Sequence, residues 1–164
     1  MPVVYLGIGS NIGRREDNCL RAISLLEENG LTITKRSAMY ETEPWGVKDQ
    51  PQFLNMAVEA VTHVSPRELL LLLKTIESSM GRLPGKKWGP RVIDIDILIY
   101  DNLTINEDEL TVPHPLLHER VFVLEPLAEI APEKVHPVLR KTIRELLNQK
   151  VSGPGDRRKK RGNE

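Results

Sequence analysis

The most regular hydrophobic pattern in the chain is an apolar run that two carboxylates interrupt. Val92 to Ile99 is rich in β-branched residues, follows a Gly-Pro pair and contains Asp94 and Asp96, which predicts a buried strand. Successive side chains of a strand point to opposite faces, so the two aspartates share one face and lie roughly 7 Å apart along the strand. We expect the other face to pack on the core through the isoleucines at positions 93, 95, 97 and 99.

Apolar stretches elsewhere predict three further strands, over 3–10, 31–40 and 53–61. A broad apolar stripe predicts a helix over 14–29, which Gly30 ends. A capping box with proline at the first helical position, Ser65-Pro66-Arg67-Glu68, begins a second helix that ends near Gly81. A short hairpin (103–105 with 110–112), a helix or turn from 118 to 130 and a last helix over 139–150 follow.

The order strand, helix, strand, strand, helix, strand predicts an α+β fold with a ferredoxin-like βαββαβ core. In this arrangement the two main helices pack on one face of an antiparallel sheet, and the strand with Asp94 and Asp96 lies beside the first strand or centrally. The elements after it are C-terminal additions. A length of 164 residues fits one domain, which we assign to residues 1–150.

Charge is balanced over the whole chain but not along it. The tail, Val151 to Glu164, holds five basic and two acidic residues, so residues 1–150 hold 18 basic and 21 acidic residues, a net charge of −3. A body with this charge does not suit nucleic-acid binding. The tail follows Ser-Gly-Pro-Gly and has no apolar pattern, so we expect it to be disordered.

Composition also bears on the compartment. No run of eighteen apolar residues is present, so we expect no membrane span. The N-terminal residues lack the features of a signal peptide, and a single cysteine, Cys19, excludes an internal disulfide. We expect a cytoplasmic monomer with small-molecule substrates.

The charged residues around the Asp94 strand suggest phosphoryl-type chemistry. Two half-buried carboxylates repel each other, and hard cations would compensate. Arg91 precedes the strand, and the loop before it contains Arg82, Lys86 and Lys87. Metals for the phosphate oxygens and cations for the developing charge are what such transfer requires. The pattern alone also fits the wet face of an edge strand, but Val92 and Leu98 on the same face favour the metal interpretation.

Three further segments have both a structural and a functional interpretation. The glycines at 7, 9 and 13 fit neither common phosphate-binding spacing. Close backbone approach at Gly7 and Gly9, and a turn made by Asn11 with Gly13, explain them structurally. Asn55 interrupts an apolar run, which suits either a structural amide or one that faces a ligand. His114 is held between two prolines, and a lone histidine is usually structural.

Several motifs, in order, resemble the 6-hydroxymethyl-7,8-dihydropterin pyrophosphokinase family, over roughly Val3 to Asn148. The most specific is Trp88-Gly89-Pro90-Arg91-x-x-Asp94-Ile95-Asp96-Ile97-Leu98. Also in the family's order are Gly9-Ser10-Asn11, Tyr40-Glu41-Thr42-x-Pro44, Phe53-Leu54-Asn55, Val112-Pro113-His114 and Glu125-Pro126-Leu127.

The resemblance implies transfer of pyrophosphate from ATP to the hydroxymethyl group of the pterin, with release of AMP, in tetrahydrofolate biosynthesis. It implies that Asp94 and Asp96 hold two Mg²⁺ ions, and that Arg82 and Arg91 take part in catalysis with them. Phe53 and Phe122 would stack on the pterin, and Thr42, Pro44 and Asn55 would contact its polar edge. The implied nucleotide-side residues are Glu77, Trp88, Arg91, Ile97, His114 and Arg120.

The chain departs from the family pattern in two places. No second arginine follows soon after Arg82, where Lys86 or Lys87 would substitute, and Pro115 follows His114 where some relatives have an aromatic residue. Two alternatives of other classes stay open: a Mg-nucleotide transferase with a different acceptor, and a non-catalytic ferredoxin-like module. A pterin-binding assay separates the first from the pyrophosphokinase, and absence of Mg²⁺-dependent ATP binding would indicate the second.

Overall fold

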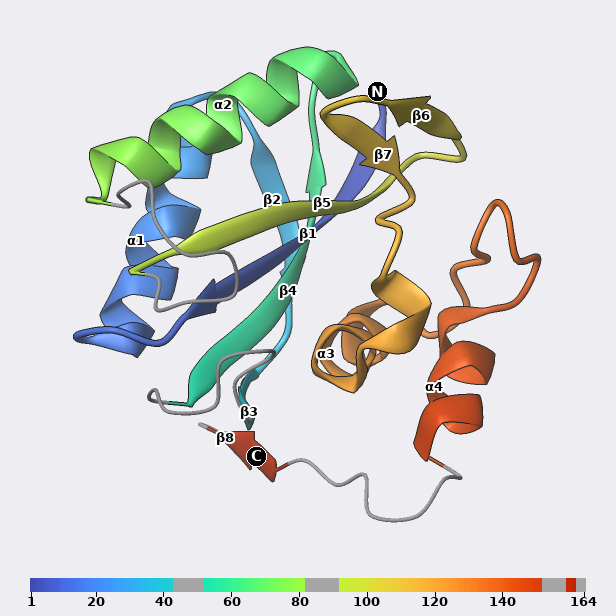
Figure 1. Cartoon of the computed structure of the whole chain (residues 1–164). Coiled ribbons are helices and arrows are strands. Elements are labelled where there is room, and N and C mark those ends of the chain that lie inside the picture. The colour runs from blue at the N-terminus through green and yellow to red at the C-terminus, as the bar shows by residue number, and fades with distance from the viewer. Residues whose placement is uncertain (43–51, 82–91, 152–158, 162–164) are drawn as a thin grey trace.

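The computed structural model describes residues 1–42, 52–81, 92–151 and 159–161 (Figure 1). Most predicted elements are present within a few residues of their expected limits, because apolar periodicity and capping residues define them locally. The elements are β1 (Val3–Ser10), α1 (Arg15–Glu28), β2 (Thr32–Arg36), β3 (Met39–Thr42), β4 (Phe53–Val61), α2 (Pro66–Ser79), β5 (Asp94–Tyr100), β6 (Ile105–Glu107), β7 (Leu110–Val112), a 3-10 turn η1 (Leu117–Glu119), α3 (Val121–Ile130), α4 (Ile143–Val151) and β8 (Lys159–Arg161).

The main sheet is antiparallel, with strand order β5-β1-β4-β3-β8 and β2 also paired with β4. This order confirms the ferredoxin-like core. β5, the strand with the two aspartates, lies beside β1 and not in the centre of the sheet. The predicted strand over 31–40 is divided into β2 and β3 at Ser37. Its backbone N–H donates to the carbonyl of Ala57 at 2.9 Å, and its hydroxyl oxygen accepts from the Ala57 N–H at 2.9 Å, in place of a regular strand pairing.

Two apolar cores lie on opposite faces of the sheet. One contains Cys19, Ile23 and Leu26 of α1 with Leu69, Leu73 and Ile76 of α2. The other contains Leu124, Leu127 and Ile130 of α3 with Ile143 and Leu146 of α4. The prediction that the two main helices share one face is therefore confirmed, and the C-terminal helices cover the second face (Figure 1).

A β-bulge changes the predicted faces of β5. Tyr5 pairs with Ile99, but its neighbour Leu6 pairs with Ile97, so Leu98 is an additional residue on β5. A bulge places two successive residues opposite one and interrupts the alternation. Ile93, Ile95 and Ile97 pack towards α1 and α2 as expected, whereas Ile99 joins Leu98 in the core under α3 and α4. The expectation that all four isoleucines share one face is therefore wrong at Ile99.

The C-terminal tail, which we expect to be disordered, is described only at its start and over three residues near its end. Val151 is the last residue of α4, and Lys159–Arg161 forms β8, which pairs with Met39–Glu41 of β3. Residues 152–158 and 162–164 lie outside the described residues. Among the helices that the structure describes, none has the length and apolar character to cross a membrane.

Candidate active site

A row of directly paired residues crosses four strands of the sheet at the site. Asp94 of β5 lies opposite Gly9 of β1, Gly9 lies opposite Asn55 of β4, and Asn55 lies opposite Tyr40 of β3. Residues directly opposite in antiparallel strands project from the same face. Asp94 and Asn55 are therefore on one face, two strand spacings or roughly 10 Å apart. The structure thus brings together two candidates that are 39 positions apart in the sequence.

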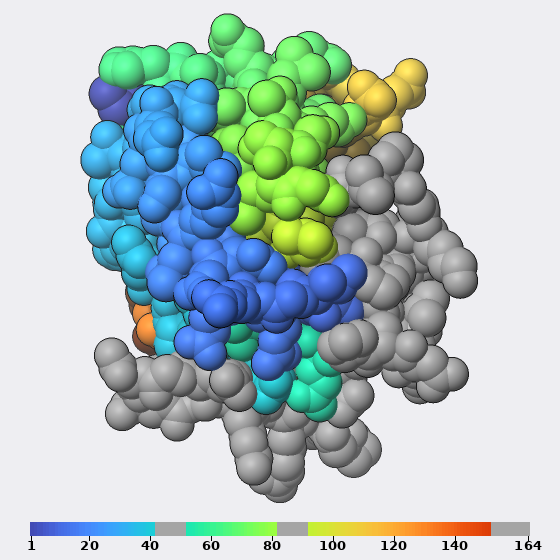
Figure 2. Space-filling model, turned by 90° about the vertical axis from the view of Figure 1, so that its left-hand side faces the viewer, coloured from blue at the N-terminus to red at the C-terminus, as the bar shows by residue number. Residues whose placement is uncertain are grey.

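The second aspartate lies in the next row on the same face. Asp96 pairs with Gly7, and Gly7 pairs with Ala57. The two aspartates pair with Gly9 and Gly7, two positions apart on β1, which confirms that they share a face, and both are half-buried. The start of β5, in yellow-green, reaches the surface between the blue N-terminal residues and α2 in green (Figure 2).

The two glycines of β1 give the face its shape. A Cβ atom at Gly9 would lie 2.7 Å from Oδ1 of Asn55 and 3.7 Å from Cδ1 of Phe53. At Gly7 the nearest atom would be Cδ2 of Leu98, at 3.4 Å. Gly9 therefore lacks a side chain where the Asn55 amide extends over β1, which supports the close-approach interpretation of these glycines.

Glu77 of α2 fixes the outer edge of β5. The backbone N–H of Ile95, between the two aspartates, donates to Oε2 of Glu77 at 2.8 Å. Glu77 is buried, and β5 is at the edge of the sheet that the described strands form, so this bond satisfies an N–H on the outer side of β5. We predicted Glu77 on the nucleotide side, and the structure places its carboxylate against the strand that carries the aspartates.

Ile97 does not present its side chain to the site. It is buried in the core under α1 and α2, on the face opposite to Asp94 and Asp96. Sequence spacing already places an odd-numbered residue of this segment on the opposite face. Any contact between Ile97 and a nucleotide therefore involves its backbone.

His114 lies beside β5 in a defined tautomer. Its backbone N–H donates to the carbonyl of Leu98 at 2.9 Å, and its Nδ1 accepts from the N–H of Leu116 at 3.1 Å. In a neutral imidazole whose Nδ1 is an acceptor, Nε2 has the proton. Burial, together with the charge of Arg120, lowers the pKa of His114 to about 4, so the ring is neutral at pH 7 and Nε2–H is a donor.

Arg120 links the aspartates to the first turn of α3. Burial lowers its pKa, and the charges of Asp96 and Asp94 act in the opposite direction, as does Glu119. An arginine in a protein is always charged, so a buried cation acts on both aspartates. Its guanidinium carbon lies 5.4 Å from the centroid of the Phe122 ring, within the range of a cation–π contact.

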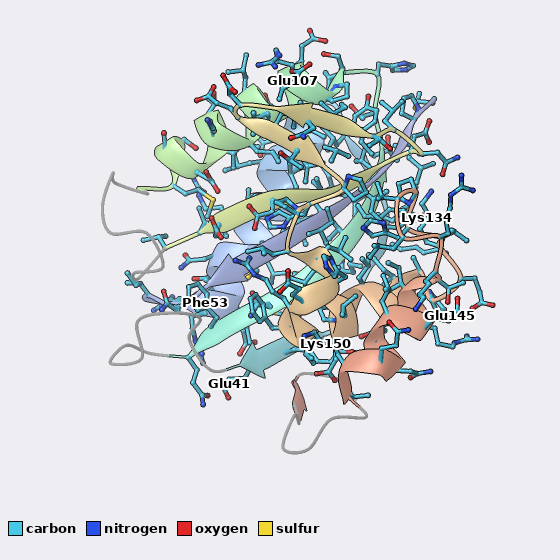
Figure 3. All side chains as sticks on the ribbon, turned by 45° about the vertical axis from the view of Figure 1, so that its right-hand side comes forward. Glu41, Phe53, Glu107, Lys134, Glu145 and Lys150 are labelled. Atoms are coloured by element: carbon cyan, nitrogen blue, oxygen red, sulfur yellow. The ribbon has the colours of Figure 1, made fainter. Side chains whose placement is uncertain are left out.

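Two of the predicted pterin residues, Thr42 and Phe53, lie two positions along β3 and β4 from the Tyr40–Asn55 pair, and Phe122 of α3 lies beside Arg120. Phe53 begins β4, is half-buried and pairs with Thr42, the last residue of β3. Figure 3 shows Phe53 at this end of the sheet, near Glu41. Pro44, Arg82, Trp88 and Arg91 lie outside the described residues, as do Lys86 and Lys87, so their predicted roles stay predictions.

Sequence reasoning missed two residues that support this face. Glu129 of α3 accepts from the Ala38 N–H at 3.1 Å and from the Tyr40 hydroxyl at 2.6 Å. Arg15 of α1 donates to Glu41 and to the carbonyl of Gln52. All these contacts join residues that are distant in sequence. The only signal in the sequence was that Tyr40 and Glu41, their partners, belong to one of the ordered motifs.

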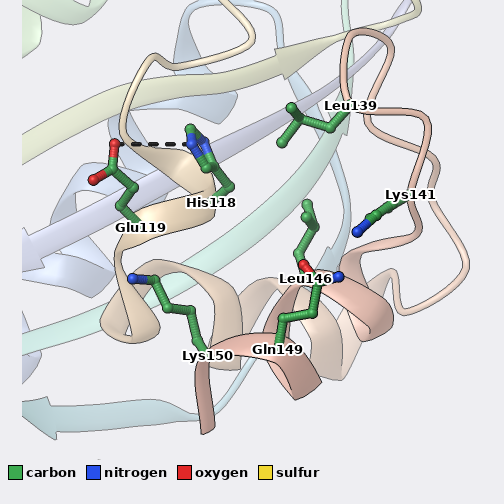
Figure 4. A pocket seen from close by; sticks show the side chains of 7 residues that line it. All are labelled: His118, Glu119, Leu139, Lys141, Leu146, Gln149 and Lys150. Carbon is green, nitrogen blue, oxygen red and sulfur yellow. Dashed lines mark ion pairs between the residues drawn. The ribbon is translucent and has the colours of Figure 1, made fainter. Parts of the chain in front are cut away.

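A separate pocket of about 310 Å³ lies between η1 and α4 (Figure 4). It is lined by His118, Glu119, Leu139, Lys141, Leu146, Gln149 and Lys150. His118 and Glu119 form an ion pair across 3.8 Å when the histidine is protonated. None of the predicted site residues lines this pocket, so it is distinct from the aspartate face.

Among the described residues, the candidate site provides only the carboxylates of Asp94 and Asp96 as ligands for a metal ion. Within 1–42, 52–81, 92–151 and 159–161, no cluster of three or more His, Cys, Asp or Glu side chains could hold a metal ion. Two carboxylates do suit Mg²⁺, which keeps several waters and is commonly bound by one or two carboxylates plus substrate phosphates. The donor set therefore fits a magnesium ion that binds together with a nucleotide.

Comparison with known proteins identifies the relatives of this chain. It is 46% identical, over 154 residues, to 2-amino-4-hydroxy-6-hydroxymethyldihydropteridine pyrophosphokinase of Aquifex aeolicus, covering 94% of this chain and 96% of the relative. It is 50% identical to the Bacillus subtilis protein of the same name, over 78% of this chain and 77% of the relative. A mitochondrial bifunctional folate synthesis protein of Arabidopsis thaliana is 49% identical over 77% of this chain, which spans only 23% of that protein.

Solved structures agree on the fold. The HPPK-DHPS protein of Plasmodium falciparum superposes with a TM-score of 0.73 at 22% identity, over 93% of this chain and 44% of that chain. This chain therefore spans less than half of that larger protein, and the likeness concerns the fold alone. The family model of 7,8-dihydro-6-hydroxymethylpterin-pyrophosphokinase matches residues 5–132. With most of its length matched and with close relatives at nearly half identity, the chain belongs to the 7,8-dihydro-6-hydroxymethylpterin-pyrophosphokinase (HPPK) family.

Proposed function

We propose that the protein transfers pyrophosphate from ATP to the hydroxymethyl group of 6-hydroxymethyl-7,8-dihydropterin and releases AMP, as a step of tetrahydrofolate biosynthesis. Membership of the HPPK family supports the reaction. The observation that carries it in the structure is the row Asp94, Gly9, Asn55. One end of this row is Asp94, which with Asp96 offers carboxylates suited to metal and phosphate. The other end is Asn55, which with Phe53 offers an amide and a ring suited to a flat, polar heterocycle.

We propose that Asp94 and Asp96 bind two Mg²⁺ ions with the ATP phosphates. Their half-burial on one face supports this, since hard cations would relieve their mutual repulsion. Bound Mg²⁺ would neutralise the phosphate oxygens and lower the pKa of the attacking hydroxyl. Arg120 would hold the two carboxylates in place, since its charge already acts on both.

On the acceptor side, Phe53 and Phe122 would stack on the pterin, while Asn55, with Thr42 and Pro44, would read its polar edge. The Asn55 amide extends over Gly9, so its position is defined before a ligand binds. A site that hydrogen-bonds a substrate rejects analogues strongly, because its own groups are then left unpaired.

On the nucleotide side, His114 would donate from Nε2, and Arg82, Arg91 and Trp88 would supply cations and an aromatic ring. Glu77 would act by holding β5 through the Ile95 N–H, and Ile97 would contribute backbone only. A guanidinium that binds the β-phosphate oxygens more tightly as AMP leaves would accelerate the chemical step. We also propose a cytoplasmic monomer, whose single cysteine needs no oxidising compartment.

The test is product analysis with ATP, Mg²⁺ and the hydroxymethyl-dihydropterin. We expect pterin-dependent AMP formation that EDTA abolishes, and a fall of at least about a hundredfold in turnover for Asp94→Asn and Asp96→Asn, because a lost metal ligand removes several kcal/mol of transition-state stabilisation. Asp108→Asn, at an exposed turn between β6 and β7, is the matched control and should keep full activity. ADP as the product, or activity without the pterin, would refute the proposal.

A further inference from the structure

One arginine at the start of α1 connects the two strands that border the predicted pterin residues. Arg15 donates from Nη1 to the carbonyl oxygen of Gln52 at 2.8 Å and from Nη2 to Oε2 of Glu41 at 2.9 Å. We call Arg15, Glu41 and Gln52 the Arg15 bridge. Glu41 precedes Thr42 at the end of β3, and Gln52 precedes Phe53 at the start of β4.

The geometry of the Arg15 bridge requires a guanidinium. One acceptor lies on β3 and the other on the residue before β4. A planar fork with fixed donors satisfies both at once, whereas a lysine ammonium is a single point charge. The side chains of Arg15 and Glu41 are only 23% and 27% exposed. The ion pair is therefore partly shielded from water and worth more than a surface pair.

Local structure does not explain an arginine at this position. Arg15 is the first residue of α1, where a cation lies near the positive end of the helix dipole. Glu16 and Asp17 fit that first turn, and Arg15 does not. A residue that opposes the local preference is expected where a tertiary contact requires it.

We propose that Arg15 is a positioning residue for the acceptor site, which holds β3 and β4 in the register that places Thr42 and Phe53 for the pterin. The inference rests on the proposed function. Thr42 pairs with Phe53, and Glu41 pairs with Leu54, so the Arg15 bridge ties down the last two rungs of this ladder. The aspartates on β5 are two strands further across the sheet, so the nucleotide side does not depend on the bridge.

The chain supplies a matched control next to Arg15. Arg14 has a side chain that is 88% exposed and a long contact of 3.8 Å with Asp17. Arg14→Ala removes the same charge from the same end of the helix and leaves the Arg15 bridge intact. A comparison of the two variants separates the bridge from the general effect of a lost cation.

The experiment is steady-state kinetics of wild type, Arg15→Ala, Arg15→Lys and Arg14→Ala, with calorimetry of the pterin alone. For Arg15→Ala we expect the KM and Kd of the pterin to rise about tenfold, with the KM of ATP changed less than about twofold, because only acceptor-side binding is lost. Arg15→Lys should lie between wild type and Arg15→Ala, and Arg14→Ala should match wild type.

Equal effects on both substrates, or equal behaviour of Arg15→Ala and Arg14→Ala, would overturn the inference. The inference would also fail if Arg15→Ala lowered the melting temperature and left both KM values unchanged, because the pair of Arg15 and Glu41 would then be purely structural. Glu41→Gln gives a second measurement, which should raise the pterin KM without adding to the effect of Arg15→Ala. If wild type forms no AMP from ATP in the presence of the pterin, the proposed function fails as well, and that outcome is separate from a failure of Arg15 alone.

Discussion

Gly9 leaves room for the Asn55 amide between β1 and β4. A Cβ atom there would meet Oδ1 of Asn55 at 2.7 Å, a separation that real Cβ atoms do not show. The flexible end of the Asn55 side chain would have to turn away, while the surrounding backbone could stay in place. We therefore expect a side chain at this position to disturb the candidate site more than the fold.

Gly9→Ala should weaken pterin binding about tenfold or more and lower the melting temperature by only a few degrees, because it moves one amide and leaves the core filled. Gly7→Ala is the control, since its Cβ would meet Leu98 at an ordinary contact distance of 3.4 Å. Calorimetry with the pterin and a thermal melt of each variant would decide. Similar affinities for both variants would show that Asn55 does not contact the pterin.

At the scale of elements, β5 depends on α2 for the position of its outer edge. The Ile95 N–H donates to Glu77 in a buried setting, and a buried donor without an acceptor costs about 1–3 kcal/mol. Ile95 lies between Asp94 and Asp96 in β5, so movement of this edge would displace both aspartates.

Glu77→Ala should reduce the free energy of unfolding by about 1–3 kcal/mol and reduce turnover with it. Glu77→Gln keeps an oxygen acceptor of similar shape, so its stability should stay within about 1 kcal/mol of wild type. Urea denaturation of the two variants measures the difference. If Glu77→Gln lost activity at unchanged stability, the carboxylate charge would have a direct role beyond its bond to Ile95.

The elements also show where sequence reasoning ends. The capping box at Ser65 and Glu68 is present as predicted, because the motif is local and its two hydrogen bonds specify the helix start. The bulge at Leu98 and the strand β8 could not be predicted. A bulge depends on a partner strand far away in sequence, and so does the pairing of β8 with β3.

Some features of the candidate site could likewise be predicted from the sequence, and others could not. The shared face of Asp94 and Asp96 follows from the strand period alone. That Asn55 lies two strands away on that face follows from the registers of β1 with β4 and β5, which join residues 46 and 85 positions apart. The resemblance to a family supplied this grouping where periodicity could not.

At the scale of the whole molecule, buried neutral histidines make stability depend on pH. The pKa of His114 is lowered to about 4, first by burial and then by Arg120, and burial also lowers the pKa of His136. An unfolded histidine titrates near 6.5, so below that pH the unfolded chain binds more protons than the folded one. The contribution of His114 to stability is therefore complete above pH 6.5 and is lost as the pH falls towards 4.

The ligand-free protein should accordingly lose about 1.4 kcal/mol of unfolding free energy between pH 7.5 and 5.5 through His114 alone, with a further loss in the same direction from His136. His114→Gln should reduce this slope even if it lowers stability at every pH, because the group that titrates is gone. His63→Gln, at an exposed position, serves as the control and should keep the wild-type slope. Urea denaturation at four pH values from 7.5 to 4.5 provides the comparison, and identical slopes for wild type and His114→Gln would mean that the ring is not held neutral beside Arg120.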